Sequence, residues 1–175
     1  MYSEDNSLNS ANYVLMQWYR RIREAQFSHY HSYNKYQKFY YRLGIPSTIL
    51  STFIGTSIFS TLKLSTTIET QILVGFISII TAIIAGLQTF FKFSQKAEEH
   101  KKAATRYGDL RREIELLFAK QKYPETEILE IIKIRINNLA YDSPPIQKDS
   151  WSHTENQIKD DISSFESKFN WENQQ

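Results

Sequence analysis

The chain has 175 residues, which is enough for one ordinary domain, and a formal net charge of +2. It contains no cysteine, which excludes disulfides, thiolate zinc sites and cysteine nucleophiles. The charge is unevenly distributed, because residues 142–175 carry three lysines and seven acidic residues whereas residues 1–141 have a net charge of +6. The basic residues form neither a groove nor a known motif, so nucleic acid is not an expected partner.

The first 41 residues predict a short polar segment followed by one aromatic helix. Residues 1–10 are polar, and we expect them to be disordered. A helix is expected over residues 11–41, because apolar and aromatic residues recur every three or four positions. This stripe comprises Leu15, Trp18, Ile22, Ala25, His29, Tyr33, Tyr36 and Tyr40. No apolar signal core lies in this region, so a cleavable signal peptide is not expected.

Two uncharged apolar runs follow, at residues 43–62 and 72–91, and a short polar link joins them. At a rise of about 1.5 Å per residue, each run forms a helix that can cross the roughly 30 Å hydrocarbon layer of a bilayer. Pro46 suits the first turn of a helix, so we expect a break near Gly44 with the first span starting there. Basic residues flank the runs on both outer sides, while the link carries one lysine and one glutamate. The positive-inside rule therefore predicts an external link and both termini in the cytosol. The same flanking cations are expected to anchor the chain to lipid head groups or to attract anions.

The sequence after the second run predicts further helix. No proline lies between Ile72 and Phe118, so the second span is expected to extend as one cytosolic helix to about residue 119. Another amphipathic helix is expected over 125–140, ended by Ser143-Pro144-Pro145. Residues 146–175 form an acidic tail with a possible short helix whose narrow stripe is Ile158, Ile162, Phe165 and Phe169. This tail is expected either to dock on the basic helices or to stay mobile.

Three stretches carry a resemblance to a known family: AQFSHYHSYNKYQKFYYRLGIPSTILSTFIGTSIF, GLQTFFKFSQKAEEHKKAATRYGDLRREIE and the later SPPI. In this order they resemble the SLATT family, over roughly residues 13–146. Members of that family are two-span proteins associated with nucleotide-sensing antiviral conflict systems. The resemblance implies a membrane effector that forms pores and dissipates ion gradients. This chain has no room for a nucleotide-sensing module, so such a sensor would be a separate partner protein.

Small and hydroxyl-bearing residues gather on one face of each expected span. In the first span they are Gly44, Ser47, Thr48, Ser51, Thr52 and Gly55, and in the second they are Gly75, Ser78, Ala82, Ala85, Gly86 and Thr89. One interpretation is close helix packing, in which small residues let backbones approach and hydroxyls bond across helices. The other is a pore lining, in which hydroxyls partly replace the hydration shell of an ion. No charged ring lies within either span, so strong ion selectivity from fixed charge is not expected.

Three further polar residues stand out on apolar surroundings. Gln88 lies inside the second span, where its amide requires a partner, and we expect an interhelical hydrogen bond or a constriction. His29 and His100 lie on the apolar stripes of two expected cytosolic helices. They are expected either to be packed histidines or to form a protonation switch that loosens the bundle. A metal site is disfavoured because His29 and His31 are two residues apart and point in different directions on a helix.

These patterns predict an all-α protein in which a two-span transmembrane hairpin continues into a cytosolic helical bundle, as a single domain over residues 11–145. The predicted function is a homo-oligomeric membrane effector that conducts ions and is gated by its cytosolic helices. The alternative is a non-conducting scaffold that docks a cytosolic partner at the bilayer. A soluble bundle is disfavoured, since helices apolar on every side need a larger protein around them. No phosphate loop or nucleophile motif is present, so neither enzymatic activity nor a cofactor is expected.

Overall fold

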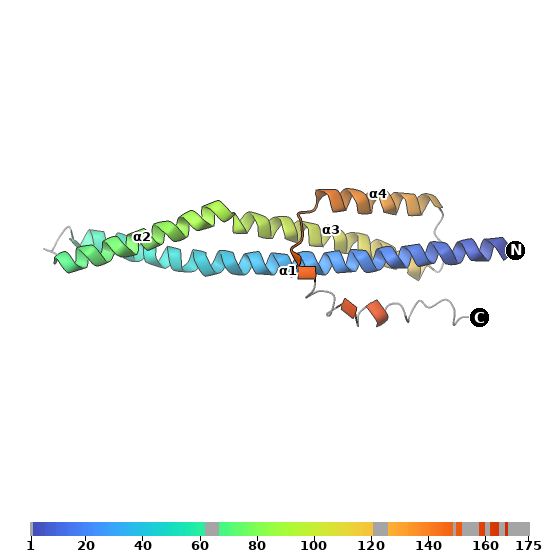
Figure 1. The fold of residues 1–175 in the computed structure, drawn as a ribbon, viewed down its shortest axis with the longest axis horizontal. Coiled ribbons are helices and arrows are strands. Elements are labelled where there is room, and N and C mark those ends of the chain that lie inside the picture. The colour runs from blue at the N-terminus through green and yellow to red at the C-terminus, as the bar shows by residue number, and fades with distance from the viewer. Residues whose placement is uncertain are drawn as a thin grey trace. The chain divides into compact units, whose positions relative to one another are not determined.

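The computed structural model describes residues 2–61, 67–120, 126–148, 150–151, 158–159, 162–164 and 167. Four long helices follow one another: α1 (Tyr2–Thr61), α2 (Ile68–Phe91), α3 (Phe93–Ala119) and α4 (Thr126–Asp142) (Figure 1). No strand occurs in these ranges, which confirms the prediction of an all-α chain for the part described. The chain divides into two units, which we call the bundle unit (Met1–Tyr33 with Glu98–Gln175) and the hairpin unit (Asn34–Ala97).

Helix α1 runs without interruption through Gly44 and Pro46, where the sequence predicted a break. A proline removes one N–H donor, but a helix continues through it when nearby groups satisfy the freed backbone. The hydroxyl of Thr48 donates to the Gly44 carbonyl at 2.9 Å, whereas the carbonyl that Pro46 leaves without an amide donor is that of Arg42. The helix also begins at Tyr2, although residues 1–10 were expected to be disordered. Adding a residue to an existing helix is far easier than starting one, so a polar segment can extend a helix that packing has nucleated.

The helix that was expected to continue from the second span is locally distorted at Lys92, between α2 and α3, although the backbone amides of Lys92 and Lys96 still donate to the carbonyls four residues earlier. Lys92 adopts a left-handed conformation with φ 48° and ψ 45°, and no other described non-glycine residue has a positive φ. In an unbroken helix, Phe91 and Phe93 would point about 200° apart. The turn at Lys92 instead stacks their rings at 5.4 Å, and Phe93 also stacks on Phe39 of α1 at 5.6 Å. These aromatic contacts offset part of the conformational cost of the left-handed residue.

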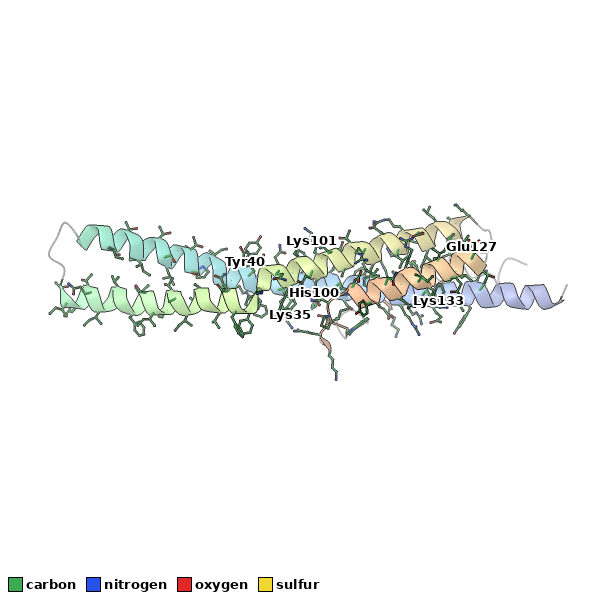
Figure 2. The ribbon with its side chains drawn as sticks, turned by 90° about the horizontal axis from the view of Figure 1, so that it is seen from above. Lys35, Tyr40, His100, Lys101, Glu127 and Lys133 are labelled. Atoms are coloured by element: carbon green, nitrogen blue, oxygen red, sulfur yellow. The ribbon has the colours of Figure 1, made fainter. Side chains whose placement is uncertain are left out.

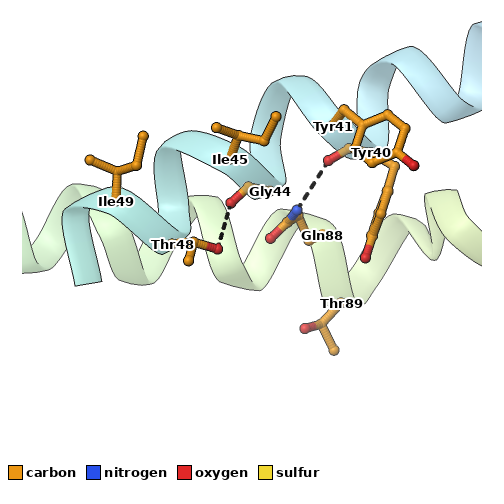
Figure 3. A pocket seen from close by; sticks show the side chains of 8 residues that line it. All are labelled: Tyr40, Tyr41, Gly44, Ile45, Thr48, Ile49, Gln88 and Thr89. Carbon is orange, nitrogen blue, oxygen red and sulfur yellow. Dashed lines mark hydrogen bonds between the residues drawn. The ribbon is translucent and has the colours of Figure 1, made fainter. Parts of the chain in front are cut away.

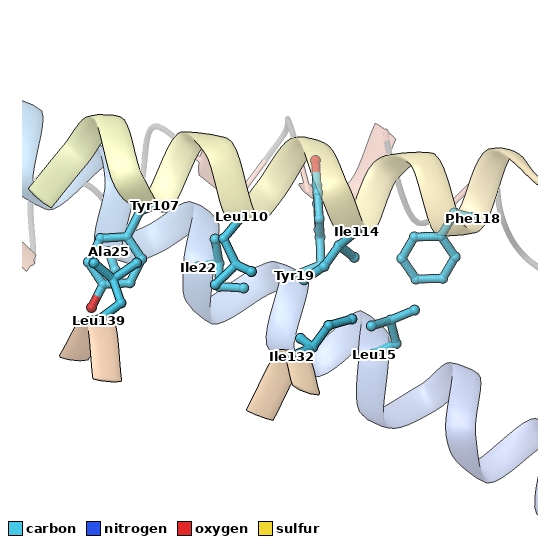
Figure 4. Packing of buried hydrophobic residues seen from close by; sticks show 10 residues of the cluster. All are labelled: Leu15, Tyr19, Ile22, Ala25, Tyr107, Leu110, Ile114, Phe118, Ile132 and Leu139. Atoms are coloured by element: carbon cyan, nitrogen blue, oxygen red, sulfur yellow. The ribbon is translucent and has the colours of Figure 1, made fainter. Parts of the chain in front are cut away.

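The bundle unit contains a hydrophobic core built by three helices (Figure 4). Leu15 and Ile22 of α1, Leu110 and Ile114 of α3, and Ile132 of α4 are each at most 2% exposed. Tyr19, Ala25, Tyr107, Phe118 and Leu139 complete the cluster. The apolar spacing of three and four residues explains this arrangement, since it places one apolar stripe of each helix toward the others. Helix α4 extends two residues beyond its predicted end.

The described parts of the C-terminal tail pack onto the bundle unit. Ser150, Ile158 and Ile162 are at most 5% exposed. The hydroxyl of Ser32 on α1 donates to the Ser150 hydroxyl at 3.0 Å. Of the two possibilities left open for the tail, docking therefore holds for these residues. Phe165 and Phe169, the last two members of the predicted tail stripe, lie outside the described residues.

Candidate functional site

In the hairpin unit, the C-terminal part of α1 and the antiparallel α2 lie side by side (Figures 1 and 2). Their outward surfaces are apolar: Ile49, Phe53, Phe76 and Phe90 are 62%, 65%, 64% and 79% exposed. Other large apolar side chains at least 40% exposed here include Ile45, Ile58, Ile72, Leu73, Ile79, Ile80, Ile83 and Leu87. Soluble monomers rarely expose a contiguous apolar surface of this extent, and such surfaces mark sites of contact with other protein chains or with a membrane.

Length and composition identify one membrane-crossing candidate among the described residues. It is the helical stretch Ile68–Ala119, whose most apolar 18-residue window has a mean hydropathy of 2.2. Only 6% of that window is buried inside the chain, whereas the core helix of a soluble protein would be mostly buried. This window falls on α2, so the hydropathy and exposure of α2 are consistent with membrane association. The end of the first expected span, at residue 62, lies outside the described residues.

The two helices of the hairpin unit pack together along a line of less exposed residues, which we call the seam. On α1 the less exposed positions include Leu43, Gly44, Ser47, Leu50 and Ile54, at helical spacing. On α2 they are Val74, Ile77, Ser78, Thr81, Ile84 and Gln88. Ser47 and Thr81 are the most buried polar side chains in the described part of this unit, each 8% exposed. Sequence reasoning missed Thr81, which its seven-residue spacing from Gln88 could have indicated.

The predicted small-residue faces are divided between this seam and the outside. Gly44, Ser47 and Ser78 belong to the seam, and Gly55 is also partly buried. The remaining members are exposed: Thr48, Ser51, Thr52, Gly75, Ala82, Ala85, Gly86 and Thr89. A side chain built at Gly55, Gly75 or Gly86 would meet no atom within 4 Å. Packing within one chain therefore does not explain why those three positions are small.

Four hydroxyls of these faces, those of Thr48, Thr52, Ser78 and Thr89, donate to a carbonyl of their own helix. Thr52 donates to the Thr48 carbonyl at 2.9 Å, Ser78 to the Val74 carbonyl at 2.8 Å, and Thr89 to the Ala85 carbonyl at 3.0 Å. A hydroxyl paired with the carbonyl one turn earlier needs no further donor or acceptor, so it can face lipid, a second helix or water.

Gln88 makes the interhelical hydrogen bond that was one of its two predicted roles. Its Nε2 donates to the backbone carbonyl of Tyr40 at 3.4 Å, a long bond (Figure 3). Gly44 permits this approach, because a Cβ there would lie 3.1 Å from the same nitrogen. Beside this contact is an open groove of about 580 Å³, lined among others by Tyr41, Ile45 and Ile49 of α1 and Thr89 of α2.

In the bundle unit, the structure brings together the two histidines that the sequence singled out. The Nδ1 atoms of His29 and His100 are 2.9 Å apart, and the residues are 1% and 3% exposed (Figure 2 labels His100). Tyr107 stacks on the His29 ring at 5.4 Å. At this distance one Nδ1 donates and the other accepts, so the two neutral rings must be different tautomers. The surrounding buried polar groups include Ser28, Ser32 and Ser150.

Both histidines are held toward the neutral form. Burial, and to a smaller extent the adjacent His100, lower the pKa of His29 from 6.5 to about 4. Burial also lowers the pKa of His100, against an opposing effect of Glu99. Two protonated rings would offer two donors and no acceptor, which would remove the hydrogen bond and bury like charges. Among the described residues, no group of three or more histidine or acidic side chains is arranged to hold a metal ion.

Comparison of the chain with protein-family models, with characterised proteins and with solved structures finds no match.

Proposed function

We propose that this protein is an integral membrane protein whose hairpin unit inserts as two spans, with both termini on the cytosolic side. The observation that carries the proposal is the apolar outer surface of α2 and the adjoining part of α1. The charges support the orientation: residues 34–97 contain six basic residues and one acidic residue, and five of the six basic residues lie in 34–42 and 92–96.

We further propose that the protein assembles into a homo-oligomer that conducts ions. A single pair of helices cannot enclose a water path, so conduction requires several copies. The outward faces supply surfaces for this, because Gly75, Ala82 and Gly86 let a neighbouring backbone approach closely. The exposed Thr48, Ser51 and Thr52 would then line the path with hydroxyls. The resemblance to the SLATT family points to the same class of membrane effector.

The bundle unit is proposed as the regulatory part of this assembly. Its core is well packed, yet it encloses the polar cluster around His29 and His100, which is less tolerant of change than an apolar core. A signal that displaces one of its helices would expose these groups and shift the assembly between states. In the family that the sequence resembles, such signals come from nucleotide-sensing proteins, so a separate sensor is the proposed partner.

Ion flux from liposomes tests the conducting function. Purified protein in vesicles loaded with a small ion or dye is expected to release it. Replacement of the outward hydroxyls in the triple variant Thr48→Leu, Ser51→Leu, Thr52→Leu should abolish release, because an apolar lining loses its water. A triple variant on an outward face of α2, Phe76→Leu, Ile80→Leu, Ile83→Leu, should retain release. Vesicles that stay sealed at high protein density, under activating and resting conditions, would contradict a conducting function.

A non-conducting scaffold is the second candidate, and one observation favours it. Helix α4 presents a second apolar face opposite to its buried one: Ile131, Ile134 and Tyr141 are 50%, 54% and 93% exposed. A cytosolic protein that binds this face would be held at the membrane. The Thr48, Ser51, Thr52 leucine variant separates the two functions, because a scaffold should keep its partner when conductance is lost.

A further inference from the structure

We propose that the groove at the cationic end of the hairpin unit is a binding site for a phospholipid with an anionic head group. The inference rests on the proposed membrane insertion and goes beyond it, because it assigns a specific lipid to a specific surface. The groove and the face of α1 that continues from it join two chemistries that a phospholipid also joins: exposed aliphatic side chains and, on the same face of α1, positive charge.

The apolar part of the site is the groove of about 580 Å³ between α1 and α2. This volume lies within the range of about 300–1,000 Å³ that is usual for small-molecule sites. On α1, Ile45 and Ile49 are 57% and 62% exposed and form an aliphatic strip one turn apart. Tyr41 stands at the end of this strip and is 51% exposed (Figure 3). The strip suits an acyl chain, and the tyrosine suits the interfacial depth of a glycerol backbone.

The cationic part of the site lies on the same face of α1. Lys38, Arg42, Ile45 and Ile49 follow one another at intervals of four, three and four residues, which places them on one side of the helix. Lys38 and Arg42 are exposed. A ligand that lies along the isoleucines therefore has two positive charges at the end of its path.

Charge within the hairpin unit favours an anionic rather than a zwitterionic ligand. The only acidic residue in 34–97 is Glu69, which begins α2. Tyr41, Lys38 and Arg42 belong to the opposite end of that helical pair, where α2 finishes near Phe91. Within 34–97 no carboxylate lies at that end, and the next acidic residues of the chain are Glu98 and Glu99. A phosphate group that carries net negative charge matches this surface, whereas a choline head group would bring a cation to it.

Native mass spectrometry of the detergent-solubilised full chain tests the site, with phosphatidylglycerol and phosphatidylcholine as probes. The wild-type protein is expected to bind phosphatidylglycerol more tightly. In the variant Lys38→Gln, Arg42→Gln this binding should weaken about thirtyfold. This follows because each basic residue near an anionic lipid contributes about 1 kcal/mol to the binding free energy. The control Lys102→Gln, Lys133→Gln removes the same charge from α3 and α4 and should bind as the wild type does. Equal affinity of the wild type for both lipids would overturn the proposal. This comparison uses only the wild-type chain, so its result does not depend on whether a variant folds.

A second pair of variants tests the apolar strip. Ile49→Trp fills the groove and should weaken binding of phosphatidylglycerol, whereas Ile83→Trp adds the same bulk to an exposed position of α2 that does not line the groove. If Ile49→Trp alters the oligomeric state and leaves lipid binding unchanged, the groove is an interface between copies and the lipid site is wrong.

Membrane extraction separates this proposal from the proposed function. A protein that resists extraction by alkaline carbonate but shows no lipid preference refutes the lipid site and leaves membrane insertion standing. A protein found in the soluble fraction refutes insertion, and the lipid site with it.

Discussion

His29 and His100 form a buried pair whose hydrogen bond exists only while at least one ring is neutral. The pKa of His29 is lowered to about 4 in the folded chain and is about 6.5 in an unfolded one. The unfolded state therefore binds more protons between these values, so stability is complete above about pH 6.5 and falls as the pH drops toward 4. From pH 7 to pH 5 the bundle unit should lose about 2 kcal/mol, as measured by denaturant unfolding in detergent followed by circular dichroism.

The double variant His29→Leu, His100→Leu provides the comparison for this pH dependence. It should lose most of the difference between pH 7 and pH 5, while His31→Gln, which alters a histidine outside the pair, should retain it. An unchanged pH dependence in the double variant would assign the effect to other groups.

For individual residues, the sequence predicted which polar side chains are important better than it predicted their hydrogen-bond partners. It singled out His29, His100 and Gln88, because each interrupts an apolar stripe, and the structure gives each an interhelical contact. It did not foresee that Thr52 and Ser78 bond to their own helices. A hydroxyl has a local partner in every helix, so spacing alone does not reveal which partner it takes.

Among the elements, the joint at Lys92 is the feature that the sequence could least predict. Glycine is the usual residue in the left-handed region, and a lysine gives no signal of it. The variant Lys92→Gly should stabilise the protein by about 0.5–1 kcal/mol, because glycine adopts this conformation without a Cβ penalty. Lys96→Gly, in the regular helix α3, should instead destabilise it by about 1 kcal/mol. Thermal unfolding of both variants checks this, and equal destabilisation would mean that the joint is ordinary helix.

The core of the bundle unit was the most predictable arrangement of elements. Tyr107, Ile114 and Phe118 of α3 recur at helical spacing in the sequence, and all three are buried. Ile114 is 0% exposed, so Ile114→Ala should lower the free energy of unfolding by about 3 kcal/mol. Leu116 is 62% exposed on the same helix, and Leu116→Ala should change the free energy of unfolding by less than about 0.5 kcal/mol. Similar losses in the two variants, measured by denaturant unfolding, would show that the three helices do not pack as described.

For the whole molecule, periodicity gave the helical class and the membership of the core, but it did not give the continuity of the helices. The helix runs through Gly44, where a break was expected, and the helical stretch Ile68–Ala119 is locally distorted at Lys92, where regular helix was expected. Proline is tolerated inside a helix when its surroundings satisfy the backbone, and aromatic packing can stabilise a turn where no glycine stands. Such effects depend on contacts between distant residues such as Phe39 and Phe93, which no local pattern contains.

Insertion of the hairpin unit with both ends on one side of the bilayer is the central claim, and cysteine labelling tests it most directly. The chain has no native cysteine, so single cysteines can be introduced at exposed positions as Tyr13→Cys, Thr67→Cys and Tyr141→Cys. With a membrane-impermeant maleimide on intact cells, we predict that Thr67→Cys is labelled at once and that the other two are labelled only after permeabilisation. Labelling of Tyr13→Cys and Tyr141→Cys from opposite sides would contradict the account.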